Sequence, residues 1–317
     1  MKRIIVGFCL CVLLIVTACD NKTAEMKGKY ISFTASIQKD ENTIETSIYS
    51  FDMSSEKAEK IYTYENRAQY PIGVYDRKDN KVYYSQNLVE QDVLYSREDG
   101  IMVYDVEMKD VSVFDDRFLT VNYIFPIDDY IFVGGELIEE IKEFNRGIKP
   151  YLVDKQSKDI QNYDWNDELH IDNLGFNSAT KTIYAAVVPF YQLYEQETPE
   201  STMYLFASNF KIKPIKEIGR KVVGSIIPSD DTYLYRTEDN RHFKDESDEA
   251  IYDATAPLEE YEHLMGRSVY YDSHNKVVYY IDGNALRKFD LKDHEDYLLY
   301  SVDEGPSHIN NAILLSD

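Results

Sequence analysis

Cationic side chains recur at regular intervals along a strongly acidic chain. The sequence has 34 Lys and Arg against 57 Asp and Glu, and its formal net charge is −23. An Arg or His stands in each of six connecting stretches, at Arg67, Arg117, His170, Arg220, His263 with Arg267, and His308. Arg binds carboxylate or phosphate oxygens with two parallel hydrogen bonds. These residues are therefore candidate ligand-binding residues for an anionic ligand. The alternative is that each cation pairs with an Asp or Glu nearby.

Two acidic stretches are candidate metal sites. The run "DESDE" (Asp245 to Glu249) could hold Ca²⁺, but it lacks the ordered EF-hand pattern with its central Gly. The stretch "DWNDELH" (Asp164 to His170) has three carboxylates and one His, without a second His or Cys at ligand spacing. A solvated charge run is the simpler interpretation of the first. We predict no metal site and no cofactor.

Known catalytic and nucleic-acid signatures are absent from the sequence. There is no G-x-S-x-G elbow, no P-loop and no dinucleotide glycine fingerprint. The three Cys are Cys9, Cys11 and Cys19, so the sequence beyond position 19 has no Cys nucleophile. The excess of negative charge argues against binding nucleic acid through a basic surface. We predict no catalytic residue from local motifs. A catalytic site assembled from residues far apart in the sequence stays open as an alternative.

The elements that must position these residues form a repeat. The stretch "YDSHNKVVYY" at Tyr271 closely matches "YDRKDNKVYY" at Tyr75, and related stretches begin at Phe125, Phe176 and Ile227. Each reads as a strand, a turn of polar residues and a second strand. A second signature, an apolar–Asp pair followed by a polar turn and another strand, has copies or weaker copies at Phe51, Tyr104, Val153, Phe206, Tyr252 and Phe289.

Each period therefore holds two hairpins, or four strands. Four-stranded units at a period of about 40 to 50 residues indicate a β-propeller. The 28 Tyr also favour half-buried strands. A large β-sandwich is the alternative, although it does not need a constant period. We predict an all-β propeller, most consistent with six four-stranded blades, with five or seven left open.

The two ends of the folded part are predicted to meet in one blade. "KYISFTASI" (Lys29 to Ile37) reads as a strand that lacks an inner neighbour, and "SHINNAILLSD" (Ser307 to Asp317) reads as a lone strand. We predict that the C-terminal strand pairs in the N-terminal blade and closes the ring, which leaves no long open edge.

The N-terminus carries a targeting signal. Lys2 and Arg3 precede the apolar run Ile4 to Val16, which is too short for an ordinary spanning helix. "VTAC" (Val16 to Cys19) resembles the bacterial lipobox. The resemblance implies diacylglyceryl transfer to the Cys19 thiol, cleavage before Cys19 and acylation of the new N-terminus, with fatty acids such as palmitate. The alternative is an ordinary signal peptide with a chance Cys.

These signals divide the chain into three parts. Residues 1–18 are the expected signal peptide, 19–29 the lipidated Cys and a polar tether, and 30–317 a single propeller domain. The expected location is the bacterial cell envelope, where the protein is lipid-anchored on the extracytoplasmic side of a membrane.

The "YYID" and "LRKFDL" segments between Tyr279 and Leu291 resemble six-bladed propellers of the TolB-like and YWTD-like type, especially bacterial lipoproteins. The resemblance covers most of the chain, but the "YWTD" tetrapeptide itself is absent, so no functional residue is carried over. Two functions stay open. One is a binding module for a protein partner or an envelope ligand. The other is an enzyme, a lyase or hydrolase, with its site at the channel mouth.

Overall fold

The computed structural model describes most of the chain from Met26 onward. The described residues are 26–40, 43–66, 71–88, 98–140, 147–194, 198–207, 211–229, 233–237, 242–244, 267–302 and 307–317. Met26 is buried and belongs to the same hydrophobic cluster as Ile31 and Phe33, so packing begins ahead of the predicted domain start at Tyr30. Within this part of the chain, no helix is long and apolar enough to cross a membrane.

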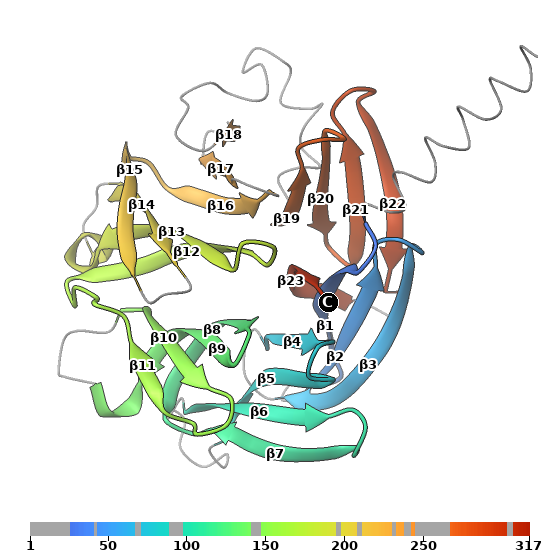
Figure 1. Cartoon of the computed structure of the whole chain (residues 1–317), viewed down its shortest axis with the longest axis horizontal. Coiled ribbons are helices and arrows are strands. Elements are labelled where there is room, and N and C mark those ends of the chain that lie inside the picture. Colours follow the sequence, from blue (N-terminus) through green and yellow to red (C-terminus); the bar gives the residue numbers. More distant parts are fainter. Residues whose placement is uncertain are drawn as a thin grey trace, which may run out of the picture.

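The described strands form six antiparallel sheets around a common centre (Figure 1). Sheet 1 has the order β23-β1-β2-β3, with bounds Ser307–Ser316, Lys29–Gln38, Ile44–Asp52 and Lys57–Asn66. Sheet 2 is β4-β5-β6-β7, with bounds Gly73–Asp76, Lys81–Asn87, Asp99–Asp105 and Asp110–Asp115. Sheet 3 is β8-β9-β10-β11, with bounds Phe118–Ile127, Tyr130–Leu137, Lys149–Asp154 and Ile160–Asn162.

The other three sheets follow in chain order around the same centre. Sheet 4 is β12-β13-β14-β15, with bounds Leu169–Asn177, Thr182–Pro189, Glu200–Phe206 and Ile212–Arg220. Sheet 5 is β16-β17-β18, with bounds Val223–Pro228, Tyr233–Thr237 and His242–Lys244. Sheet 6 is β19-β20-β21-β22, with bounds Arg267–Asp272, Val277–Asp282, Ala285–Asp290 and Glu295–Ser301. Two short 3-10 helices, η1 (Ile138–Glu140) and η2 (Phe190–Tyr194), follow β9 and β13.

The predicted all-β propeller is confirmed, with a difference in the number of complete blades. Five sheets have four strands, against the six predicted, and sheet 5 has three within the described residues. The weak repeat copy at Tyr252, which would supply its fourth strand, lies outside those residues. The repeat was least well marked at this place because few of its residues match the other copies.

The first and last strands of the folded part lie in one sheet. β23 pairs antiparallel with β1 from Lys29↔Ser316 to Ile37↔Ser307. Hydrogen bonds also join β23 and β1 to sheets 6 and 2. The Ile309 N–H donates to the Gly283 carbonyl at 2.9 Å, and the Thr34 hydroxyl donates to the Gly73 carbonyl at 2.8 Å. β23 is therefore built into the contacts between sheets on both sides.

One turn type recurs in the tight turns at the ends of the hairpins. An Asp or Asn ends the strand, and its side-chain oxygen accepts backbone N–H groups two or three residues on, as at Asp52, Asp105, Asp154, Asn177 and Asp290. The fourth residue after that Asp or Asn has a positive φ in each case, at Glu56, Lys109, Lys158, Lys181 and His294. The same pair occurs at Asp76 with Asn80 and Asp272 with Lys276. The Asx turn and the left-handed residue together reverse the chain.

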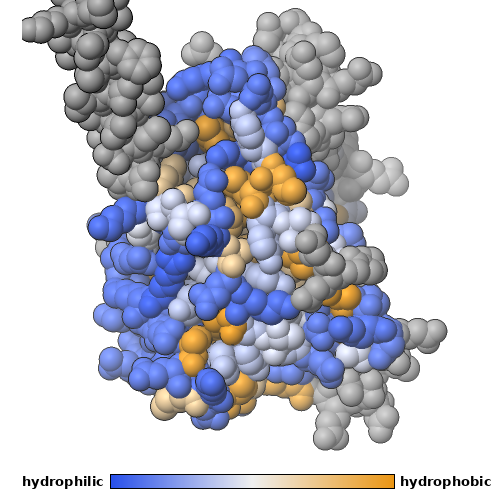
Figure 2. Space-filling model, turned by 90° about the vertical axis from the view of Figure 1, so that its right-hand side faces the viewer, coloured by the Kyte–Doolittle hydropathy of each residue, from blue (hydrophilic) through white to orange (hydrophobic). Residues whose placement is uncertain are grey.

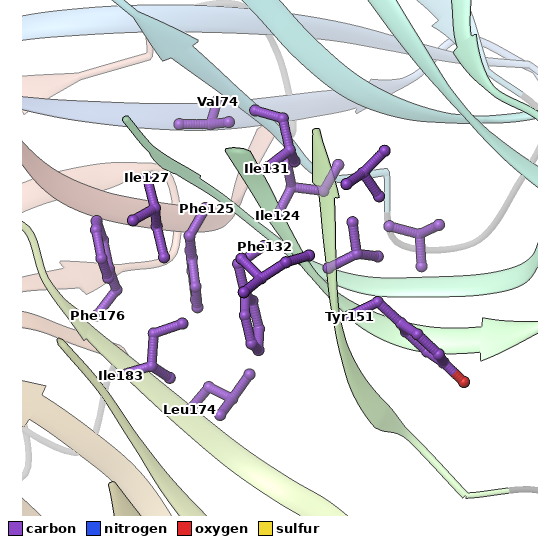
Figure 3. Close-up of a cluster of buried hydrophobic side chains, with 14 of the residues drawn as sticks. Val74, Ile124, Phe125, Ile127, Ile131, Phe132, Tyr151, Leu174, Phe176 and Ile183 are labelled. Carbon is purple, nitrogen blue, oxygen red and sulfur yellow. The ribbon is translucent and has the colours of Figure 1, made fainter. Parts of the chain in front are cut away.

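Aromatic rings fill the space between sheets 3 and 4. Figure 3 shows Phe132, Phe125 and Phe176 side by side, and the Phe125 ring stacks on both neighbours with centroids 5.7 and 5.4 Å apart. Val74 of sheet 2 and Ile313 of β23 belong to the same cluster. The core therefore lies in the interfaces between sheets, as the apolar faces of the repeat predict.

Candidate functional site

The ends of the sheets form two different faces. We call one the turn face, because it carries the Asx turns such as Asp52–Glu56 and Asn177–Lys181. We call the other the loop face, because it carries the longer connections that join β1 to β2, β13 to β14 and each sheet to the next. Lys29 and Asp317 lie at the turn face, since both stand at the end of sheet 1 where β2 reaches Asp52. The candidate site lies on the loop face and in the centre that it surrounds.

The innermost strands are irregular near the loop face. Their pairing registers shift by one residue, which leaves one residue of the strand without a partner across the pair, at Asn122, Asp172, Gly224, Val269 and Asn310. Bulges of this kind redirect side chains and are common beside binding sites. Asn122 is exposed, and Asp172 and Asn310 are half-buried. The Asn310 amide donates to the Ser36 hydroxyl and, at 3.0 Å, to the Pro71 carbonyl. The bulges thus place polar side chains on three of the inner strands.

The residue after the bulge reaches the next sheet. The Tyr123 hydroxyl donates to the Asp172 carbonyl at 3.4 Å, and the Asn173 amide donates to the Gly224 carbonyl at 3.3 Å. Asn311 donates in the same way to the Gly73 carbonyl at 3.3 Å. These bonds link sheet 3 to 4, 4 to 5 and 1 to 2, so the bulges also fix how the inner strands lie against one another.

Buried hydroxyl groups mark the inner strands of sheets 5 and 6. The hydroxyl oxygens of Ser225 and Ser268, on the two inner strands, are buried without a hydrogen-bond partner, and so is that of Ser229. The only β-bridge between the two sheets among the described residues joins Ser229 to Tyr271 at the turn face. Unpaired buried hydroxyls cost about 1 to 3 kcal/mol each.

Two predicted ligand-binding cations lie on the outer rim and have acidic partners. The Arg117 guanidinium binds the Asp115 carboxylate through two hydrogen bonds and also donates to the Lys158 carbonyl in the β10–β11 turn. Arg220 stands opposite Glu200 in the outer strands of sheet 4, at 3.4 Å. In both cases the cation pairs with a nearby Asp or Glu, which is the alternative to binding an anionic ligand.

His170 begins an inner strand but is held as a neutral side chain. Its Nδ1 accepts the Ile148 N–H at 3.0 Å, and its ring lies 6.4 Å from that of Phe190. Burial lowers the pKa of His170 from 6.5 to about 4, because the charged form loses its hydration. His170 therefore carries no positive charge at neutral pH and acts as a hydrogen-bond acceptor.

The remaining predicted residues fall in two groups. His308 is exposed on β23, the inner strand of sheet 1, and near the loop face. Arg267 begins the inner strand β19, but its side chain is outside the described part, as are Arg67 and His263. The structure thus places His170, Arg267 and His308 on inner strands and Arg117 and Arg220 on the rim. The anion-binding role of this set stays a prediction.

The state of His170 predicts how stability changes with pH. The folded protein disfavours the charged imidazole, so neutral His170 makes its full contribution to the free energy of unfolding above pH 6.5. This contribution is lost as the pH falls from 6.5 to about 4 and changes no further below that. The pKa difference corresponds to about 3 kcal/mol at most. We expect urea unfolding at pH 7 and pH 4.5 to show a larger loss for wild type than for His170→Asn, whose amide oxygen can accept the same N–H. Equal losses in both proteins would contradict this assignment.

A small aromatic knob projects from the connection between β13 and β14. The 3-10 helix η2 buries Phe190 and exposes Tyr191, Leu193 and Tyr194. The Phe190 ring packs edge-on against the Tyr194 ring at 5.5 Å. Phe190 is buried against His170, although it stands in a connection between two strands. The connection between β9 and β10 begins with the short η1, and residues 141–146 lie outside the described part.

The bulges were missed by the sequence analysis. Asn122, Asp172 and Asn310 follow no shared motif, since a bulge is a backbone feature that several residue types allow. The only available signal was the polar residue inside each inner strand, such as Asn122 between Val121 and Tyr123. Among the described residues, no group of three or more His, Cys, Asp or Glu side chains could hold a metal ion.

Comparisons with known proteins bear on the fold alone. No family model matches the chain, and no curated protein matches it. Among solved structures, TolB from Acinetobacter baumannii matches with a TM-score of 0.53 and 12% identity, over 91% of this chain and 67% of that chain. Regucalcin, a calcium-binding protein from Agrobacterium tumefaciens, matches with a TM-score of 0.45 and 11% identity, over 71% of each chain.

A third match is the β-propeller domain of the Trilobed protease from Pyrococcus furiosus. Its TM-score is 0.47 and its identity 10%, over 84% of this chain and 83% of that chain. At these identities only the architecture is shared, and of these three matches TolB has a TM-score above 0.5. The predicted resemblance to TolB-like propellers is confirmed at the level of the fold.

Proposed function

We propose that this β-propeller is a lipid-anchored binding module, held on the extracytoplasmic side of a membrane of the bacterial cell envelope, whose loop face binds a protein partner or an envelope ligand. One observation carries the proposal. The N-terminal end of the folded part stands at the turn face, opposite the loop face. A chain anchored by its N-terminus therefore keeps its irregular face free for a partner.

The length of the tether supports this arrangement. Six residues lie between Cys19 and Met26, which is already part of the core, so the chain makes seven residue steps. A fully extended chain rises about 3.3 to 3.6 Å per residue, so Met26 lies at most about 25 Å from a lipidated Cys19. The turn face would therefore stay close to the membrane surface, and the loop face would be presented away from it.

We propose further that the propeller is a closed ring of six blades. Contacts that join each sheet to the next support this, including those between sheets 6 and 1, where Lys288 pairs with Glu56 at 2.9 Å. Six complete blades would require a fourth strand in sheet 5, where the described residues form three. A closed ring is a rigid scaffold for binding loops.

A matched pair of variants tests the anchor. We expect Cys19→Ala, made in the full chain, to lose incorporation of labelled fatty acid and to remain unprocessed before position 19, because the thiol is the acceptor of the lipid. The control is Cys11→Ala, which removes a Cys inside the expected signal peptide and should be lipidated and anchored as wild type. Normal fatty-acid labelling and membrane anchoring of Cys19→Ala would refute the lipoprotein assignment.

A further inference from the structure

The η2 knob (Phe190–Tyr194) carries three large apolar side chains that are exposed within four residues. Tyr191 is 61% exposed, Leu193 38% and Tyr194 74%. The other exposed large apolar side chains in the described part are Val111 and Val113 on β7, Tyr297 and Leu298 on β22, and the single residues Leu88 and Met108. Figure 2 looks at the side that carries β22 and β3 and shows a mostly hydrophilic surface with several separate apolar patches. Three adjacent exposed side chains of this size mark a contact site more often than a chance surface.

The knob is held in place by contacts beneath it. Phe190 is buried and packs on both His170 and Tyr194. The Phe190 N–H donates to the Glu168 carbonyl at 2.7 Å, and the Gln192 side chain accepts the Glu200 N–H at 2.7 Å. Because these contacts hold η2 in place, Tyr191 and Tyr194 lose little conformational freedom when a partner buries them. This favours their use as an anchor.

The charges around the knob limit what can cover it. Asp167, Glu168 and Glu200 are exposed beside it, and Lys149 and Arg220 pair with two of these acids. The whole chain adds a net charge of −23. An anionic membrane surface and a second copy of this chain would both be repelled by this field. A basic surface would be attracted to it.

We infer that the η2 knob is the anchor of a protein–protein interface, and that Tyr191 and Tyr194 insert into an apolar pocket of a partner whose rim is basic. The inference rests on the proposed function, because it names the part of the loop face that binds. Tyr is among the residues that contribute most to such interfaces when it is fully buried. The surrounding acids speed the encounter and make it depend on salt.

The test uses the full-length anchored protein in its native envelope. A photoreactive benzoylphenylalanine replaces Tyr191, and in a matched protein it replaces Tyr297, which is 41% exposed on β22. We expect a discrete protein adduct from position 191 and none of that size from position 297. A lipid adduct, or the same adduct from both positions, would overturn the inference.

The partner identified by cross-linking is then purified, and its dissociation constant for the propeller is measured. We expect Tyr191→Ser combined with Tyr194→Ser to raise this dissociation constant at least tenfold. Tyr297→Ser should change it less than twofold, and added salt should weaken the wild-type complex. An unchanged constant in the double variant would overturn the inference. Adducts formed only from a different loop-face position, such as Lys39, would refute the role of the η2 knob as the contact site. The proposed function would still stand. Loss of anchoring alone would refute the proposed function.

Discussion

Deletion of Ser307–Asp317 is expected to abolish cooperative folding of the whole propeller. The strand β23 buries Ile309, Ile313, Leu314 and Leu315, which belong to the two largest clusters in the described core. Burial of four such side chains contributes about 6 kcal/mol or more. Domains of this kind are stable by about 5 to 15 kcal/mol in total. The deletion also exposes the inner edge of β1, which promotes aggregation. Circular dichroism and a urea titration measure the effect.

Two substitutions within β23 keep this prediction informative if the deletion protein cannot be purified. Ile313→Ala should cost about 2 to 4 kcal/mol, because its side chain is fully enclosed between sheets. His308→Ala, at an exposed position of the same strand, should cost less than about 0.5 kcal/mol. A melting temperature unchanged by the deletion would show that β23 does not close the ring.

Replacement of Lys155 by Ala is expected to cost about 3 kcal/mol of unfolding free energy. Lys155 lies in the β10–β11 turn of sheet 3, is only 10% exposed and binds Asp76 at 2.8 Å and also Asp79 in the β4–β5 turn of sheet 2. Its removal leaves Asp76, which is equally buried, without its cation. Breaking a buried pair in this way costs about 3 to 5 kcal/mol, and access of water at Asp79 reduces that value.

The neighbouring Lys78 is the matched control. It also joins two sheets at the turn face, through Asp128 at 3.3 Å, but it is 59% exposed. Lys78→Ala should change the unfolding free energy by less than about 1 kcal/mol, because exposed pairs contribute little. Asp76→Asn combined with Lys155→Met should recover part of the loss, since the charge left behind is removed. Similar losses for Lys78→Ala and Lys155→Ala would contradict the account of this contact.

The repeat was predictable because its signals are local. The Asp or Asn that begins each turn and the polar residues after it are determined by hydrogen bonds within five residues, so "YDSHNKVVYY" and "YDRKDNKVYY" give the same hairpin. The pairing of β23 with β1 was also predictable, since each segment lacked a strand neighbour in its own period. The number of complete sheets was not, because the fifth unit is poorly marked.

The candidate site was much less predictable, for a different physical reason. Whether a cation is free depends on contacts between distant residues, such as that of Arg117 with the Lys158 carbonyl. His170 was expected as a possible positive charge, but burial keeps it neutral. The bulges at Asn122 and Asp172 depend on how two strands pair, and Phe190 is buried only because His170 and Tyr194 surround it. None of these contacts has a local motif.

Cross-linking mass spectrometry on intact envelopes tests the central claim most directly. Lys39 and Lys221 are exposed at the loop face, and Lys109 and Lys292 are exposed at the turn face. An amine-reactive cross-linker of short span should join a partner protein to Lys39 or Lys221 of the anchored propeller. It should give no partner links at Lys109 or Lys292. Partner links confined to Lys109 and Lys292 would contradict the proposal that this protein binds through its loop face.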